Sequence, residues 1–225
     1  MTNDPIDRLL LAVLALVSGV VAVVFLLGGV EYAYQRIGIS AQAMFGLIFA
    51  ELAGSAVNIP IKRLPAEPEQ SVQDVQVFGM RFRLPVAREQ TTTIAVNLGG
   101  AVIPTAVSVY LLVKDSIWAQ AAVGVVVVTV VAHLLARPVR GVGITLPGFI
   151  PPLVAAGIAL AVAPHMAAPV AYVSGTLGTL IGADILNLPR LRELGGGVAS
   201  IGGAGTFDGV FLSGIMAVLL VGAGR

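Results

Sequence analysis

Long apolar runs alternate with short polar segments along most of the chain. Each run has roughly the 20 residues that a helix needs to cross about 30 Å of hydrocarbon. The pattern predicts an all-α polytopic membrane protein with about seven transmembrane helices. The predicted spans are Leu9–Val30, Gly38–Val57, Thr93–Val113, Ile117–Ala136, Ile144–Ala163, Ala167–Leu188 and Ala204–Gly224.

Two of these runs contain residues that interrupt a helix. The fifth includes PGFIPPL, Pro147–Leu153, and proline both lacks an N–H donor and kinks helices. We therefore expect span five to be bent or partly re-entrant, and the sequence leaves open whether it crosses fully. The third begins with NLGGAVIP, Asn97–Pro104, which predicts a second kink.

The segment between spans two and three has a different period. The stretch VQVFGMRFRLP, residues 75–85, alternates apolar and polar positions, as a strand does. It predicts a β-hairpin that turns near Phe78-Gly79, with IPIKRL, Ile59–Leu64, as a candidate third strand. The chain then divides into residues 1–58 with spans one and two, 59–92 as the loop with the hairpin, and 93–225 with spans three to seven.

Basic residues predict the orientation, because cytoplasmic loops carry the excess of Lys and Arg. With seven spans, ten of these side chains share one side and three lie on the other. This split predicts an N-in, C-out protein of the cell (inner, cytoplasmic) membrane, with the hairpin loop in the cytoplasm. A six-span alternative without span five gives eight against five. The ten are Arg8, Lys62, Arg63, Arg81, Arg83, Arg88, Arg137, Arg140, Arg190 and Arg192.

Composition narrows the possible partners. The chain is 57% hydrophobic and 11% charged, whereas soluble domains are about 25% charged. A net charge of +1 excludes a nucleic-acid partner, because no basic surface exists to neutralise phosphates. The chain has no cysteine, and we expect no cofactor and no metal site. The expected partners are membrane lipid and either a transmembrane peptide or a small solute.

Three acids fall inside apolar runs. Glu51 lies in span two, Asp184 in span six and Asp208 in span seven, all at a similar depth on the cytoplasmic side. Spans six and seven are antiparallel neighbours, so the two aspartates are candidates to meet, share a proton and act as a catalytic pair. The candidate second-shell or ion-binding residues are Glu51, Asn97, Asn187, Gly203 and Gly205.

Structural roles remain open for the same acids. Asp184 has Arg190 and Arg192 nearby in sequence as salt-bridge partners. Asp208 is also placed to be a first-turn acid that the helix dipole favours. Glu51 is also a candidate for a hydrogen bond to a neighbouring helix.

Several stretches resemble an uncharacterised prokaryotic membrane protein family, domain of unknown function 1614. That resemblance implies a membrane protein and names no activity. The matching stretches are NIPI (Asn58–Ile61), NLGGAVIP (Asn97–Pro104), ARPVRGVGITLPGFIPP (Ala136–Pro152), GTLGTLIGADILNL (Gly175–Leu188) and SIGGAGTFDGVFLSG (Ser200–Gly214).

The placement of the aspartates is similar to that in intramembrane aspartyl proteases of the presenilin and signal-peptide-peptidase type. Those enzymes carry one aspartate on span six and one on span seven, the latter in a Gly-x-Gly-Asp motif, which Asp184 and Asp208 match by span. The second motif here is GAGTFD, Gly203–Asp208, with two residues inserted before the acid.

Two functions from different classes follow from these residues. The first is an intramembrane aspartyl hydrolase, protease-like, in which Asp184 and Asp208 alternate as acid and base. The alternative is a small-solute or cation transporter, in which the same acids bind a proton or cation and the interrupted spans three and five act as gates. A scaffold or lipid-binding protein without catalysis is the third hypothesis.

Overall fold

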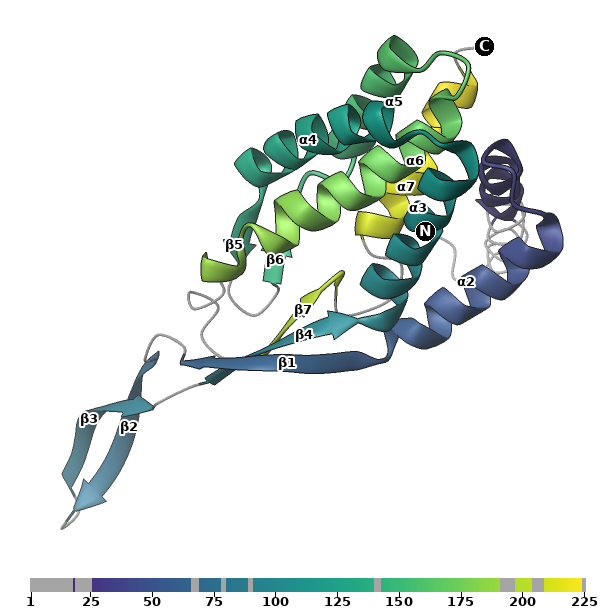
Figure 1. The fold of residues 1–225 in the computed structure, drawn as a ribbon. Helices are drawn as coiled ribbons and strands as arrows, with labels where there is room; N and C mark the ends of the chain where they lie inside the picture. The colour runs from purple at the N-terminus through teal and green to yellow at the C-terminus, as the bar shows by residue number, and fades with distance from the viewer. Residues whose placement is uncertain are drawn as a thin grey trace, which may run out of the picture.

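A computed structural model describes the chain at residue 18 and at residues 26–65, 69–77, 80–88, 91–139, 143–190, 197–203 and 209–223. Helices make up most of it (Figure 1). The helical elements are a helix over Leu26–Arg36, α2 (Ala41–Ser55), the π-helical segment η1 (Leu98–Val102), α3 (Ile103–Asp115), α4 (Trp118–Leu135), α5 (Ile150–Val162), α6 (Ala167–Thr179), the π-helical segment η2 (Leu180–Ile185) and α7 (Gly209–Ala223).

The core of the protein is built around α6, which lies among α3, α4, α5 and α7 (Figure 1). Every residue of α6 except Leu177 is buried. A helix that is buried on all sides must be apolar or small-sided all round, and AAPVAYVSGTLGT meets this condition. The position of α6 therefore determines where its few polar side chains lie.

Small residues bring α4 and α6 into close contact. Gly124 of α4 faces Ser174, and Gly178 of α6 lies against Val128, where an added Cβ would be 2.6 Å from the Val128 Cβ. One turn further, Gly182 packs against the backbone of Thr129. Such spacing lets two helix backbones approach closely in an apolar environment, where tight packing replaces the hydrophobic effect.

Three small sheets lie at one end of the helices, which we call the sheet end (Figure 1). In the three-stranded sheet, β1 (Asn58–Pro65) pairs antiparallel with β4 (Thr91–Asn97), and β4 pairs parallel with β7 (Gly197–Ile201). The short strands β5 (Arg137–Val139) and β6 (Gly143–Thr145) form another sheet.

The third sheet is a hairpin of β2 (Glu69–Val77) and β3 (Met80–Arg88). Val77 pairs with Met80. Phe78 and Gly79, near which the sequence predicts the turn, lie outside the described residues. The segment IPIKRL does form a strand, within β1, but that strand pairs with β4 and not with the hairpin.

The third predicted span begins too early. Residues 93–97 belong to β4, and the helical part of that segment starts at Leu98. The stretch TTTIAV is rich in β-branched side chains, which favour strands, and β4 has partners on both of its sides. The local apolar character of this stretch thus reflects a buried strand.

Three described helices are long and apolar enough to cross a membrane: Leu98–Asp115, Trp118–Leu135 and Ala167–Arg190. The pair Leu26–Arg36 and Ala41–Ser55, bent by 115°, makes a fourth when it is taken as one broken span. Ile150–Val162 and Gly209–Gly222 are shorter apolar helices. The protein is thus mostly helical with three or four candidate spans, and the count of seven stays a prediction.

The bend in that pair has a local cause. Gly38 adopts φ +77°, a left-handed conformation that side chains disfavour, and it follows directly on the end of the first helix. The Lys114 ammonium donates a hydrogen bond of 2.9 Å to the Ile37 carbonyl, and Ser40 caps α2. We call the end that carries Gly38, Lys114 and His165 the bend end.

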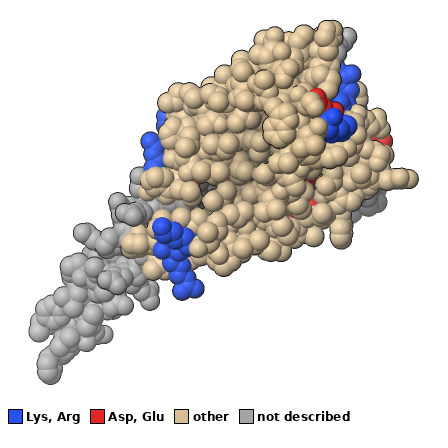
Figure 2. Space-filling model, in the orientation of Figure 1, with Lys and Arg blue, Asp and Glu red and all other residues tan. Residues whose placement is uncertain are grey.

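Charged side chains lie mainly at the two ends. Figure 2 shows Lys and Arg at both ends of the molecule and a broad uncharged surface between them. Many large apolar side chains of this middle region are exposed, among them Phe45, Phe49 and Val126. An exposed apolar surface bordered by charges is what a lipid bilayer requires of an embedded protein.

Gly182→Ala tests the close packing of α4 on η2, the continuation of α6. The new methyl group would collide with the Thr129 carbonyl and lie 2.9 Å from the Ala132 Cβ. We expect this overpacking to lower the free energy of unfolding in mixed micelles by about 1–3 kcal/mol. Gly157→Ala in α5 is the matched control, because no atom lies within 4 Å of its added Cβ. It should be neutral or stabilising by up to about 1 kcal/mol, from helix propensity alone. Equal effects of the two substitutions would contradict the packing account.

Candidate functional site

The structure tests the predicted aspartate pair only in part. Asp184 lies on η2, and its side chain is partly buried. Asp208 and Gly205 fall outside the described residues, so the meeting of two aspartates stays a prediction. What the structure does give is the surroundings of Asp184, Asn97, Asn187, Gly203 and Glu51.

Two π-helical segments come together near Asp184. Segment η1 leads directly into α3, and η2 continues directly from α6. Ala101 of η1 and Leu180 of η2 belong to one buried apolar cluster with Val210 of α7. Single π-turns are rare and occur frequently at functional sites, because they widen a helix locally. Their convergence makes this the first place to look for function.

Gly202, just after β7, connects the two π-helical segments. Its N–H donates a hydrogen bond of 2.7 Å to the Asp184 Oδ2 on η2. On its other side, a Cβ at Gly202 would lie 2.6 Å from the Ala101 nitrogen on η1. Gly202 also has φ +82°, so only glycine meets both the space and the backbone requirement at low cost. Asp184 is therefore tied to the end of the sheet.

Asn97 has a structural role at the start of η1. Its Nδ2 donates to the Ser55 carbonyl at 2.7 Å and to the Asn58 Oδ1 at 3.1 Å, and its Oδ1 accepts from the Gly100 N–H at 2.7 Å. Ser200 of β7 donates to the same Asn58 oxygen. One buried amide thus joins the end of α2 to β1, β4 and η1.

Asn187 and Gly203 also support the backbone around Asp184. Asn187 is fully buried, and its Nδ2 donates to the carbonyls of Gly182 and Ala183 at 2.8 and 3.0 Å. Gly203 has φ +86°, and its N–H donates to the Ser200 carbonyl at 3.2 Å in the turn after β7. Both residues hold the ends of elements in place.

Glu51 differs from these groups, of which Asn187 leaves one side-chain oxygen, Oδ1, without a partner in the described residues. Its side chain is 7% exposed, and neither carboxyl oxygen has a hydrogen-bond partner of good geometry within the described part of the chain. The carboxyl lies close enough to the hydroxyls of Tyr34 and Tyr172 to interact electrostatically with both. Both tyrosines are fully buried, and their hydroxyls also lack such a partner among the described residues.

We call Tyr34, Glu51, Tyr172 and Thr176 the Glu51 cluster. Thr176 lies one turn after Tyr172 on α6, and its buried hydroxyl is near that of Tyr172 but forms no hydrogen bond of good geometry in the described residues. The absence of a side chain at Gly214 of α7 makes room here, since a Cβ would lie 3.2 Å from the Tyr172 ring. The cluster therefore draws on the Leu26–Arg36 helix, α2 and α6.

Three of these four residues are not among the site residues predicted from the sequence. Tyr34 falls between predicted spans one and two, and Tyr172 and Thr176 fall within predicted span six. The available signal was hydroxyl groups within otherwise apolar runs, since a buried hydroxyl needs a partner. No group of three or more His, Cys, Asp or Glu that would suit a metal ion occurs in the residues that the structure describes.

Comparison with known proteins gives a family and no activity. A family described as "Protein of unknown function (DUF1614)" matches residues 52–220. No curated protein and no solved structure matches the chain. The matched range begins at Leu52, one residue after Glu51, and contains both π-helical segments and the whole sheet end.

A pair of identical substitutions tests the role of Asn97. Asn97→Asp keeps the oxygen that accepts from the Gly100 N–H but replaces the donor with a carboxylate oxygen, which then faces the Ser55 carbonyl and the Asn58 Oδ1 as a buried charge against two acceptors. We expect a loss of about 2–4 kcal/mol in the free energy of unfolding. Asn58→Asp is the control, because Asn58 is exposed and its Oδ1 acts only as an acceptor in this network. It should change stability by less than about 1 kcal/mol. Similar losses at both positions would contradict this assignment.

Proposed function

Because the chain belongs to the DUF1614 family, which has no described activity, we propose a function from its geometry: a membrane transporter for a small solute or a cation, with the Glu51 cluster as its proton- or cation-binding site. The transport hypothesis of the sequence analysis gave this role to Asp184 and Asp208. The proposal moves it to Glu51.

We propose the membrane arrangement that the loop charges predict, with seven spans, the N-terminus inside and residence in the cell (inner, cytoplasmic) membrane. The arrangement of the described helices supports it. The basic residues Lys62, Arg63, Arg137 and Arg190 fall in β1, in β5 and after η2, all at the sheet end. In this arrangement the sheet end and the hairpin face the cytoplasm.

The observation that carries the proposal is the buried carboxyl of Glu51, which faces the hydroxyls of Tyr34 and Tyr172 and has no hydrogen bond of good geometry in the described residues. A charged group in an apolar interior costs several kcal/mol unless it is paired, protonated or bound to a cation. Acids inside membrane helices therefore mark proton and ion pathways by default. If Glu51 had only a structural role, its carboxyl would be expected to accept hydrogen bonds from its neighbours, as the Asn97 Oδ1 accepts one from the Gly100 N–H.

The chemistry of the cluster suits a hard cation or a proton. One carboxyl, two phenol hydroxyls and one threonine hydroxyl supply only oxygen atoms, which are the ligands that alkali and alkaline-earth cations prefer. When no cation is bound, the hydroxyls of Tyr34 and Tyr172 can turn to donate to the carboxyl. A bound proton or cation would neutralise the carboxyl, so that it no longer needs hydrogen bonds from Tyr34 and Tyr172. The packing of the two tyrosines would then change.

The location of the cluster also suits transport. Glu51 is on the second limb of the bent pair, and its neighbour Tyr34 lies in the last turn of the first limb, just before the break. Transporter sites are commonly built where helices are broken. The Glu51 carbonyl lies at the crossing of α2 with Gly99, so a movement of α2 would reach η1 directly. The hydrolase hypothesis rests on Asp208, outside the described residues, and stays a prediction.

Glu51→Gln tests the proposed site. Glutamine keeps the size and polarity of the side chain and cannot take up a proton or neutralise a cation. We expect the variant to fold as the wild type does, and to lose proton- or cation-driven flux into proteoliposomes down to the rate of protein-free vesicles. Flux is measured with a pH-sensitive dye under imposed gradients of H⁺, Na⁺ or K⁺.

Glu31→Gln is the matched control, because Glu31 is near the surface and contacts Gln35 on its own helix. It should transport at the wild-type rate. Infrared difference spectra provide a second readout, since cation or proton binding should change a carboxyl band that is absent in Glu51→Gln. Unchanged flux and an unchanged carboxyl band in Glu51→Gln would refute the proposal.

A further inference from the structure

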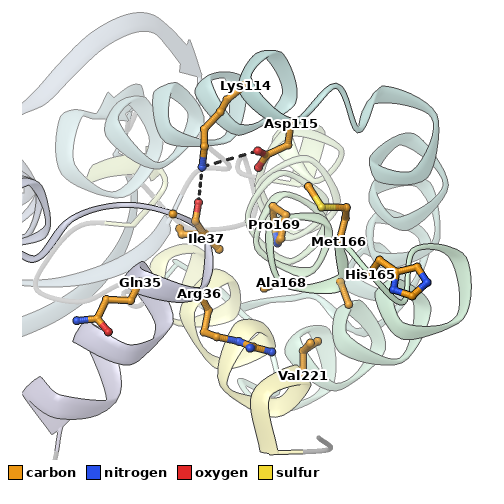
Figure 3. Close-up of a pocket in the computed structure, with 12 residues that line it drawn as sticks. Gln35, Arg36, Ile37, Lys114, Asp115, His165, Met166, Ala168, Pro169 and Val221 are labelled. Atoms are coloured by element: carbon orange, nitrogen blue, oxygen red, sulfur yellow. Dashed lines mark hydrogen bonds and ion pairs between the residues drawn. The ribbon is translucent and has the colours of Figure 1, made fainter.

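A second polar site lies at the bend end, far along the helices from the sheets. A cavity of about 250 Å³ opens between the Gln35–Gly38 turn, the end of α3 and the start of α6. Figure 3 shows Arg36, Lys114 and His165 on different sides of the space around Ala168 and Pro169. These three side chains come from three separate segments, so the fold itself gathers them.

The cavity favours an anion. Arg36 and Lys114 are positively charged side chains, and His165 is a third basic side chain. Among the described residues that line the cavity, Asp115 is the one acid, and it lies 3.7 Å from the Lys114 ammonium and so offsets a single charge. Lys114 also donates to the Ile37 carbonyl and stands 5.7 Å from the centre of the Tyr110 ring. A net positive charge therefore remains for a ligand.

An apolar groove begins where this cavity ends. It lies between α2 and α3, has a volume of about 810 Å³ and shares Gly38 with the cavity. Tyr110, whose ring faces the Lys114 ammonium, lines the part of the groove nearest the bend end. Ala50 and Val102 line the part nearest the sheet end. Its other walls are mostly small or aliphatic, formed by Ala43, Gly46, Leu47, Ile103, Ala106 and Val107.

The groove has the direction and length of a lipid chain. From Tyr110 to Val102, α3 covers about 12 Å at 1.5 Å per residue, close to the roughly 15 Å of hydrocarbon in one leaflet. The groove runs from the bend end of the helices toward the middle of the molecule. Its volume lies within the range of about 300–1,000 Å³ that is typical of ligand sites.

We propose that the bend end binds an anionic phospholipid, with its phosphate in the Arg36–Lys114–His165 cavity and one acyl chain in the α2–α3 groove. The positive cavity and the apolar groove meet at Gly38, as the head and tail of a phospholipid meet. A soluble anion would leave the groove empty, and a partner helix would leave the positive charges unpaired. This inference rests on membrane embedding and does not depend on transport by Glu51.

Native mass spectrometry of the full chain in a mild detergent tests this site. The protein is titrated with phosphatidylglycerol and, separately, with phosphatidylcholine that carries the same acyl chains. We expect phosphatidylglycerol to bind more tightly by about fivefold or more, since one basic contact to an anionic lipid is worth roughly that factor. Glycerol 1-phosphate, the head group alone, should not displace it at equal concentration.

Two variants separate the head from the tail. Arg36→Gln should weaken phosphatidylglycerol binding about fivefold and leave phosphatidylcholine unchanged. Arg36 is exposed, and its contact in the described structure is with the Tyr32 ring, so the fold should survive. Gly46→Leu should fill the groove and weaken both lipids, because nothing lies within 4 Å of its added Cβ. Gly157→Leu, equally unobstructed on α5, is the control and should bind like the wild type.

Each contrary result has a defined meaning. Equal binding of the two lipids, or an Arg36→Gln variant that binds as the wild type does, would refute the head-group site. Displacement by glycerol 1-phosphate would reduce the site to one for free anions, which also refutes the proposal. If Gly46→Leu leaves lipid binding unchanged and instead abolishes a dimer, the groove is an interface between two copies.

Discussion

The burial of α6 on every side is the constraint on which the structure depends. Because α6 has no face left for solvent or lipid, its neighbours must approach closely, and glycines on both partners make that possible. Ser174 faces Gly124, Gly175 lies against the backbone of Ser213, and Gly214 accepts Tyr172 and Thr176. The same packing places Tyr172 in the interior and sets η2 beside η1.

Polar groups in this interior fall into two kinds. At the sheet end, Asn97, Asn58, Ser200 and Asp184 engage one another or the backbone through well-formed hydrogen bonds. These groups hold β1, β4, β7 and the π-helical segments together. In the Glu51 cluster, oxygen atoms gather without such bonds among the described residues. Satisfied networks rigidify a structure, whereas unsatisfied ones are better suited to receive a ligand.

The sequence predicts the helical elements well where composition alone decides them. Apolar length indicated α4, and α6 together with η2, nearly to their ends, and two-residue alternation indicated the hairpin of β2 and β3. It could not indicate that β4 pairs with β7, because that pairing joins residues about 100 positions apart and depends on the helices between them. For the same reason Tyr34 and Tyr172 gave no sign that they meet Glu51. Of the predicted site residues, Asn97 and Asn187 form hydrogen bonds to the backbone, which their spacing in sequence did not indicate, and their part in a site stays a prediction.

The parallel pairing of β4 with β7 also bears on the order in which the protein is made. β4 leaves the ribosome before α3 to α6, and its partner strand follows only after all four of those helices. Until then, one edge of β4 has no neighbour, and an open edge invites pairing with the wrong strand. The sheet end is therefore completed only after α3 to α6 have been made, when Gly202 inserts between η1 and η2. In a growing chain, the environment of Asp184 is completed only at this late stage of synthesis.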